Sequence, residues 1–129
     1  MMLSLLFLAA SAELQALDQA VAQCDRAVIT PAFSSESDRR SKFLLDAYRE
    51  QEAIVAARLD LSARRRMLRE AEAKDNAEED RAIALEQALL EDRQRALNDQ
   101  RMLEGLRQSA MDAMRRHYLT HCATRKHKD

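Results

Sequence analysis

The sequence predicts an all-α fold: a long antiparallel helical hairpin of the coiled-coil type, preceded by a short N-terminal helix. Ala, Leu, Arg, Glu and Lys make up 73 of the 129 residues, a composition typical of long helices and coiled coils. One Gly and one Pro provide little chemistry for turns. Aromatic residues are 4% of the chain and Trp is absent, so any interior is built from aliphatic side chains and Met. This composition excludes a compact α/β enzyme.

Residues 1–12 have the features of a secretory signal peptide. They carry no charge and end in Ala10-Ser11-Ala12, an A-x-A site of the kind that signal peptidase cleaves. Cleavage there would leave a mature chain that begins at Glu13. The alternative is an apolar helix start in a cytoplasmic protein. The apolar run of about 10 residues is well short of the ~20 needed to cross a bilayer.

The two cysteines, Cys24 and Cys122, lie near the two ends of the mature chain. An even cysteine count in an exported protein favours a disulfide. A bridge between them would close a loop of about 100 residues, which the chain-entropy model values at up to ~4.7 kcal/mol. Two unlinked thiols in a cytoplasmic protein are the alternative.

Residues 13–29 are expected to form a short helix, because apolar residues recur on one face. Thr30-Pro31 is expected to end it, since Pro lacks a backbone N–H and disfavours helical geometry in the preceding residue. Residues 30–35 then form a linker. The apolar face of this helix consists of Leu14, Leu17, Val21, Cys24 and Val28.

Two long helices are predicted to follow, over residues 36–74 and 77–120, with a basic tail over residues 121–129. Ser35 and Asp38 have the spacing of a capping box at the start of the first. Asp75-Asn76 is the best turn candidate, because both residue types favour caps. The alternative architecture is one continuous helix from Glu36 to Thr120 in a dimeric coiled coil.

A fold about residue 76 places residue i opposite residue 152 − i. In this register Leu61 lies beside Leu90, and Val55 lies opposite Leu97. The register also brings a run of arginines alongside acidic residues of the other helix: Arg64, Arg65, Arg66 and Arg69 beside Glu86, Glu91 and Asp92.

Small residues in the same register suggest a close approach of the two helices, because Gly105 falls opposite Ala47. The second long helix carries two apolar lines at seven-residue spacing, which together indicate contact with more than one neighbour. That neighbour is the short helix or a second copy of the chain. The first line is Leu89, Ala96, Leu103 and Ala110; the second is Ile83, Leu90, Leu97, Met111 and Tyr118, with Glu104 as its one gap.

A weak candidate metal site lies near the C-terminus, where His117 and His121 are four residues apart, with Cys122 adjacent and His127 nearby. These residue types bind zinc or copper. The surroundings are basic, however, and Cys122 leaves the ligand set if it is oxidised. We therefore expect a solvated helix end, with no metal and no cofactor.

The basic tail is a candidate binding segment for anionic lipid or an acidic partner. Nucleic acid is not expected, because no aromatic residues are interleaved to stack on bases. Four methionines on apolar faces would fill the core or form an adaptable binding surface. The basic residues of the tail and of the helix end before it are Arg115, Arg116, Arg125, Lys126 and Lys128; the methionines are Met67, Met102, Met111 and Met114.

No catalytic motif is present: there is no phosphate-binding glycine loop, nucleophile elbow or H-E-x-x-H sequence. The sequence thus favours a non-enzymatic, exported helical protein of the cell envelope, periplasmic or secreted, that binds a protein partner or itself. It has no expected small-molecule substrate. The alternative is a chaperone-like or anionic-lipid binder that uses the Met-lined faces and the basic tail. In composition alone the chain resembles the Skp-type periplasmic chaperones, whose β-rich body it lacks.

Overall fold

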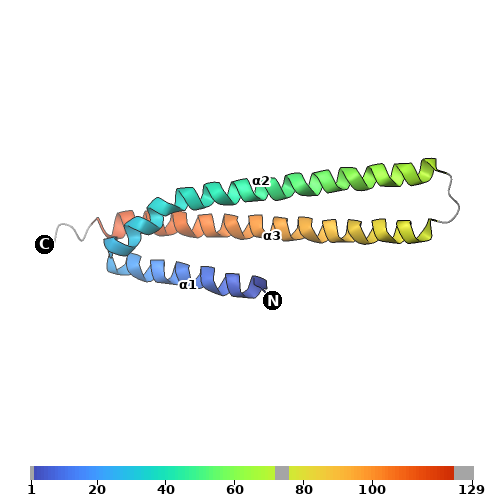
Figure 1. Cartoon of the computed structure of the whole chain (residues 1–129). Coiled ribbons are helices and arrows are strands. Elements are labelled where there is room, and N and C mark those ends of the chain that lie inside the picture. Colours follow the sequence, from blue (N-terminus) through green and yellow to red (C-terminus); the bar gives the residue numbers. More distant parts are fainter. Residues whose placement is uncertain (1, 72–75, 124–129) are drawn as a thin grey trace. The chain divides into compact units, whose positions relative to one another are not determined.

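The structure, a computed structural model, describes residues 2–71 and 76–123, with side chains described from residue 12 onward. It contains three helices, α1 (Met2–Gln23), α2 (Arg26–Glu70) and α3 (Ala77–His121), shown in Figure 1. No strand occurs in this part of the chain. Because α2 and α3 pack against each other in opposite directions, the predicted helical hairpin is confirmed.

The alternative of one continuous helix is wrong. α2 ends at Glu70 and α3 begins at Ala77, and an ion pair joins Arg64 of α2 to Glu79 of α3. Asn76 directly precedes α3, and its carbonyl accepts a 2.8 Å hydrogen bond from Asp80 N. The other half of the predicted turn, Asp75, lies outside the described residues.

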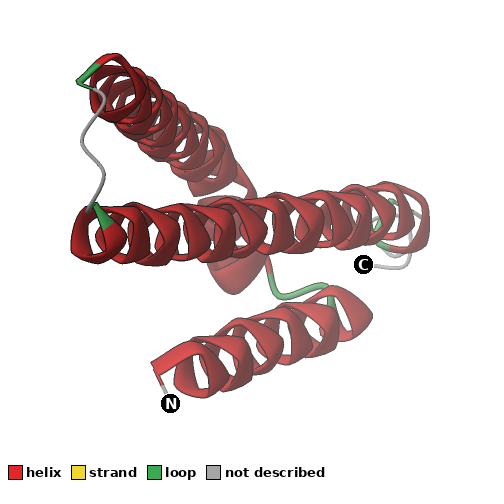
Figure 2. Ribbon diagram, turned by 90° about the vertical axis from the view of Figure 1, so that its right-hand side faces the viewer, coloured by secondary structure: helices red, strands yellow, loops and turns green. Residues whose placement is uncertain are grey.

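The junction between α1 and α2 lies earlier than the sequence suggested, and Figure 2 shows the short loop that forms it. The expected helix over 13–29 and linker over 30–35 are wrong, because α1 ends at Gln23 and α2 begins at Arg26. Cys24 has a φ of 56°. Asp25 N bonds to Ala20 O and Cys24 N to Val21 O, which is the hydrogen-bond pattern of a Schellman motif. Asp25, a preferred N-cap residue, then precedes α2.

Pro31 lies inside α2 and does not end a helix. Its ring nitrogen cannot donate the helical hydrogen bond that another residue at this position would make to the carbonyl of Ala27. Ser35 is not an N-cap: its Oγ donates to the carbonyl of Ala32, and Ser34 Oγ donates to that of Pro31. The predicted capping box therefore does not form.

The chain divides into two compact units. The three-helix unit comprises Met1–Ser41 and Glu104–Asp129, and the two-helix unit is Lys42–Leu103. The core of the three-helix unit takes side chains from α1, α2 and α3, with the aromatic rings of Phe33 and Tyr118 packed at its edge. Its buried members are Leu17, Ala20, Val21, Ile29 and Met111.

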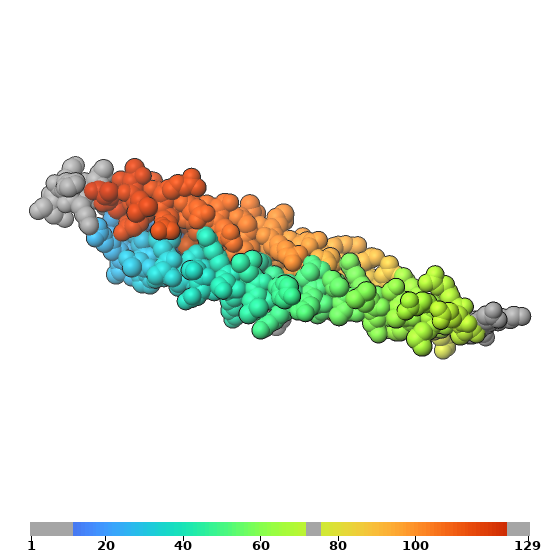
Figure 3. Space-filling view, turned by 90° about the horizontal axis from the view of Figure 1, so that it is seen from above, coloured from blue at the N-terminus to red at the C-terminus, as the bar shows by residue number. Residues whose placement is uncertain are grey.

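The two-helix unit holds two small apolar clusters between α2 and α3, which run side by side there in Figure 3. Leu61 packs with Leu90 as predicted. The residue that packs against Leu97 is Ile54, which is fully buried, whereas Val55 is 46% exposed. The predicted pairing of Val55 with Leu97 is therefore wrong by one position.

Polar contacts flank these clusters. Gln51 and Gln94 exchange two amide hydrogen bonds of 2.9 and 3.0 Å. The close approach expected at Gly105 is not made, because a Cβ built there meets no atom within 4 Å.

One apolar line of α3 is buried along the helix. Its members share seven-residue spacing and are at most 8% exposed: Ile83, Leu90, Leu97, Glu104 and Met111. The other predicted line faces outward at Leu89, which is 55% exposed. Among the described residues, no helix combines the length and hydrophobicity that a bilayer span requires.

Truncation of Ile54 should destabilise the protein far more than truncation of its neighbour. Ile54→Ala leaves a cavity against Leu97 and should lower the free energy of unfolding by about 2 to 4 kcal/mol. Val55→Ala, a change at a half-exposed position, is the matched control and should cost well under 1 kcal/mol. Denaturant unfolding followed by circular dichroism measures both, and equal losses would contradict the register described here.

Candidate functional site

A charge network occupies the point where the apolar line of α3 is interrupted by Glu104. Glu104 and Glu36 are both buried, and both accept hydrogen bonds from Arg39. Arg39 Nη1 and Nη2 lie 2.8 and 2.7 Å from the two carboxylate oxygens of Glu104. Arg39 Nε and Nη2 lie 3.0 and 2.5 Å from those of Glu36. One guanidinium therefore joins two buried carboxylates from different helices.

Arg107 extends this network to α1. Its Nη2 lies 3.0 Å from Glu13 Oε1 and 3.4 Å from Glu36 Oε2. Arg40 adds a contact between its Nε and Glu36 Oε1 at 3.5 Å. We use the name charge network for Glu13, Glu36, Arg39, Arg40, Glu104 and Arg107, all of which belong to the three-helix unit.

The arginines keep both buried carboxylates ionised. Burial acts to raise the pKa of Glu36, but hydrogen bonds from Arg39 and Arg107 outweigh it, and the pKa lies below its ordinary value. The hydrogen bond from Arg39 lowers the pKa of Glu104 against the effect of burial, and Gln108 adds to the lowering. The hydrogen bonds to Glu104 and Glu36 raise the pKa of Arg39, and the bond to Glu104 has the larger effect. The network is therefore a set of paired charges.

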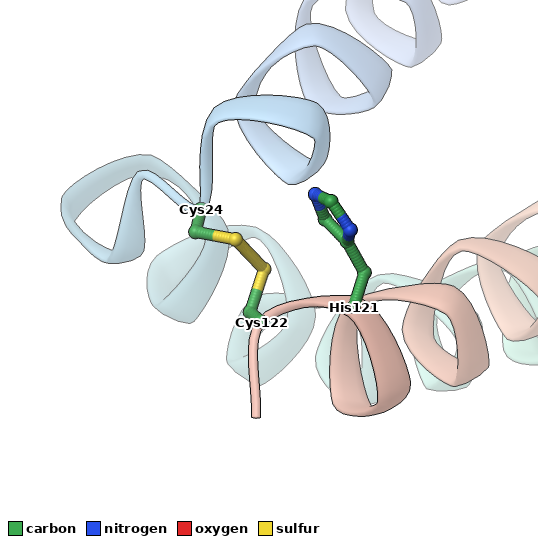
Figure 4. Close-up of side chains that lie close together, drawn as sticks. All are labelled: Cys24, His121 and Cys122. Atoms are coloured by element: carbon green, nitrogen blue, oxygen red, sulfur yellow. A yellow bond between two sulfur atoms is a disulfide. The ribbon is translucent and has the colours of Figure 1, made fainter. Parts of the chain in front are cut away.

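At the end of the three-helix unit, the structure links Cys24 to Cys122 in a disulfide with a Cα–Cα distance of 5.6 Å, drawn in Figure 4. Cys24 lies in the turn between α1 and α2, and Cys122 directly follows α3. The bridge closes 98 residues. The early end of α1 makes this geometry accessible, because a helix running on to residue 29 would have carried Cys24 away from the turn.

His121 stands beside this disulfide (Figure 4). Its Nε2 donates to the carbonyl of Ala22 over 3.2 Å. The ligand atoms of Cys24, His121 and Cys122 all lie within 4.8 Å of one another. We call these three residues the cysteine-histidine cluster.

The other weak metal candidate, His117, stacks on His121 with ring centroids 5.1 Å apart and is not a member of the cluster. His127 lies outside the described residues. Sequence spacing linked His121 to Cys122 and His117. It missed Cys24 as a neighbour of His121, because that proximity depends on the Schellman turn.

A third feature is an apolar stripe on the outer face of α2 in the two-helix unit. Its residues recur at helical spacing and are between 46% and 67% exposed: Leu44, Tyr48, Val55 and Leu59. On α3 of the same unit, Leu85 and Leu89 are also exposed. Large apolar side chains gathered on one face are typical of a surface that another protein covers.

The other arginines singled out in the sequence are paired or exposed where the structure describes them. Arg64 forms ion pairs with Glu79 at 3.2 Å and with Glu86 at 2.7 Å, and Arg65 bonds to Gln87. Arg115 and Arg116 are exposed on α3, whereas Arg125, Lys126 and Lys128 lie outside the described residues.

The methionines likewise differ in exposure. Met111 is buried and Met114 is half-buried in the core of the three-helix unit. Met67 and Met102 are exposed. The core-filling and binding-surface interpretations thus apply to different methionines.

Comparisons with protein-family models, with curated protein sequences and with solved structures find no match to this chain.

The buried carboxylates should make the protein sensitive to acid. Because the folded-state pKa values of Glu36 and Glu104 are lowered, their stabilisation is present above the unfolded-state pKa of about 4.3 and is lost as pH falls through the folded values. Glu104→Gln removes one titrating group, so the free energy of unfolding should fall less steeply below about pH 4.3 than in the wild type.

Asp92→Asn is the matched control, because Asp92 is exposed and pairs with Arg95 of its own helix. Since exposed ion pairs contribute little stability, this variant should change the acid dependence less than Glu104→Gln does. Urea unfolding at a series of pH values measures each slope, and an unaltered slope in Glu104→Gln would contradict the assigned pKa direction.

Proposed function

We propose that this chain is a small exported helical protein that works, without catalysis, as a protein-interaction module of the cell envelope. The observation that carries the proposal is the apolar stripe Leu44, Tyr48, Val55 and Leu59 on the two-helix unit. The stripe is separate from the buried face of α2, which contains Ile54 and Leu61. It is therefore available for a second contact.

The occupant that fits this surface best is a second copy of the chain. In the three-helix unit, α1 provides a third helix that packs on α2 and α3. The described part of the two-helix unit has only α2 and α3, and both carry exposed leucines. Two copies that pair through this unit would form a four-helix arrangement, which buries more apolar area than a helix pair does.

Two features support export. The first is the A-x-A sequence before Glu13. Cleavage there would keep Leu14, Leu17 and Val21, the α1 residues that pack in the core. A Cys24–Cys122 disulfide persists in oxidising compartments and is rare in the cytosol of mesophiles.

The state of the buried carboxylates supports a non-enzymatic role. A carboxyl group that acts as a general acid near neutral pH needs a raised pKa. Glu36 and Glu104 have lowered pKa values and are held by arginines. Their chemistry is that of structural ion pairs.

Export and the disulfide are tested together by the intact mass of the protein secreted from a bacterial host. We expect a chain that begins at Glu13 and gains two hydrogens on reduction. A chain that keeps residues 1–12 and has free thiols would overturn the export proposal.

Self-association is tested by size-exclusion light scattering on the oxidised protein. We expect a dimer for the wild type, and a monomer for the double variant Tyr48→Ser with Leu59→Ser, because the two polar side chains remove apolar area from the stripe. Leu119→Ser is the matched control: Leu119 is also exposed, at 58%, but belongs to the three-helix unit. A monomeric wild type would contradict pairing through the stripe.

A second candidate function, binding of unfolded clients or anionic lipid, is favoured by the exposure of Met67 and Met102. Met is a flexible side chain that adapts to varied apolar partners. Removal of residues 124–129 distinguishes the two proposals. Loss of binding to anionic vesicles or to unfolded clients supports the second, whereas self-association through the stripe does not depend on the tail.

A further inference from the structure

We propose that reduction of the disulfide turns the cysteine-histidine cluster into a zinc-binding site whose protein ligands are Cys24, His121 and Cys122. The two states exclude each other, because the same sulfur atoms either bond to one another or bind the metal. The site lies wholly within the three-helix unit and is independent of the apolar stripe on the two-helix unit.

The residue types suit zinc. Zn²⁺ prefers thiolate and imidazole ligands in tetrahedral geometry, and three protein ligands leave a fourth position for water or another donor. Cys24 comes from the turn between α1 and α2, whereas His121 and Cys122 come from the end of α3. The fold thus adds Cys24, from a distant part of the chain, to His121 and Cys122, which are adjacent in the sequence.

The distances require only small movements. With Zn–S bonds of about 2.3 Å and tetrahedral angles, the two sulfur atoms of a zinc site are about 3.8 Å apart, and each lies about 3.5 Å from the histidine nitrogen. The ligand atoms of the cluster are already within 4.8 Å of one another. Cys24 and Cys122 are held with their Cα atoms 5.6 Å apart, so side-chain rotation after reduction provides the needed separation.

The environment of His121 also suits a metal ligand. A ligating histidine usually donates its other ring N–H to a carbonyl or carboxylate, which fixes the tautomer and the orientation of the ring. His121 Nε2 donates a hydrogen bond of this kind to Ala22 O in this structure.

The chemistry balances with a dithiol as reductant. The S–S bond accepts two electrons and two protons from the dithiol, which becomes a disulfide, and Cys24 and Cys122 become thiols. Zn²⁺ then displaces both thiol protons and accepts electron pairs from two thiolates and one imidazole nitrogen, so that binding releases two protons.

The test is a titration of the reduced full chain with Zn²⁺ in competition with a chromophoric chelator, with a phosphine reductant that does not bind metal. We expect one saturable site per chain, and no such site in the oxidised protein. A parallel titration with Co²⁺ should give the thiolate-to-metal charge-transfer absorption that reports bound sulfur.

Four variants assign the ligands. Cys24→Ser and Cys122→Ser each leave one thiolate, so each should lower the charge-transfer absorption to half or less of its wild-type intensity. His121→Gln should weaken zinc binding by at least about tenfold, because even the loss of a hydrogen bond to a metal ligand has an effect of that size. His117→Gln is the matched control, since His117 stacks on His121 but is outside the cluster; it should bind as the wild type does. Circular dichroism of each reduced variant checks that its helices remain.

Two results would overturn the assignment. One is a reduced wild type without saturable binding. The other is binding that persists in both cysteine variants and is lost in His117→Gln, which indicates an exposed histidine pair alone. Neither result depends on the oligomeric state or on export, so failure of this inference is distinguishable from failure of the proposed function.

Discussion

The buried line of α3 is the constraint on which both units depend. A chain that is poor in glycine and aromatic residues cannot enclose a wide core, so it buries one line of side chains at seven-residue spacing. In the two-helix unit, Ile83, Leu90 and Leu97 supply that line and pack on Ile54 and Leu61. In the three-helix unit, Met111 continues it and packs on α1 and α2.

The polar member of that line, Glu104, has a structural consequence of its own. A buried carboxylate is costly without partners, and Arg39 satisfies both of its oxygens while also holding Glu36. A shift of one helix past the other would separate these charges and leave them buried without partners. The reciprocal amide pair of Gln51 and Gln94 in the two-helix unit has the same effect. Polar pairs inside an apolar contact thereby favour one register over its alternatives.

Much of the hairpin was predictable from the sequence because its signals are repeated along the chain. The line through Ile83 and Leu97, with Glu104 as its gap, was visible as a period of seven, and α3 begins at the residue after Asn76. Local geometry was harder to predict from the sequence. The register assigned to Val55 was wrong by one position, because a fold about a single residue cannot resolve which neighbour faces the partner helix. The close approach predicted at Gly105 is not made, since a small residue permits a close approach but does not require one.

The junction between α1 and α2 could not be predicted for a specific physical reason. Pro31 is the strongest helix-breaking residue in the chain, yet α2 continues through it. Cys24 instead occupies the left-handed conformation, which usually selects glycine. A non-glycine residue there costs about 1 to 2 kcal/mol, and tertiary contacts must compensate for it.

The arrangement around that strained residue links fold and chemistry. The turn at Cys24 ends α1, brings its side chain to Cys122, and places the carbonyl of Ala22 where His121 can donate to it. A covalent bond across 98 residues and a hydrogen bond from the neighbouring histidine thus both hold α1 against the end of α3. If the disulfide is reduced, only the hydrogen bond of these two links remains. A metal bound by the same three residues would restore a cross-link between the same helices. The strained turn is therefore compatible with either cross-link, because both use the placement of Cys24 that the left-handed conformation provides.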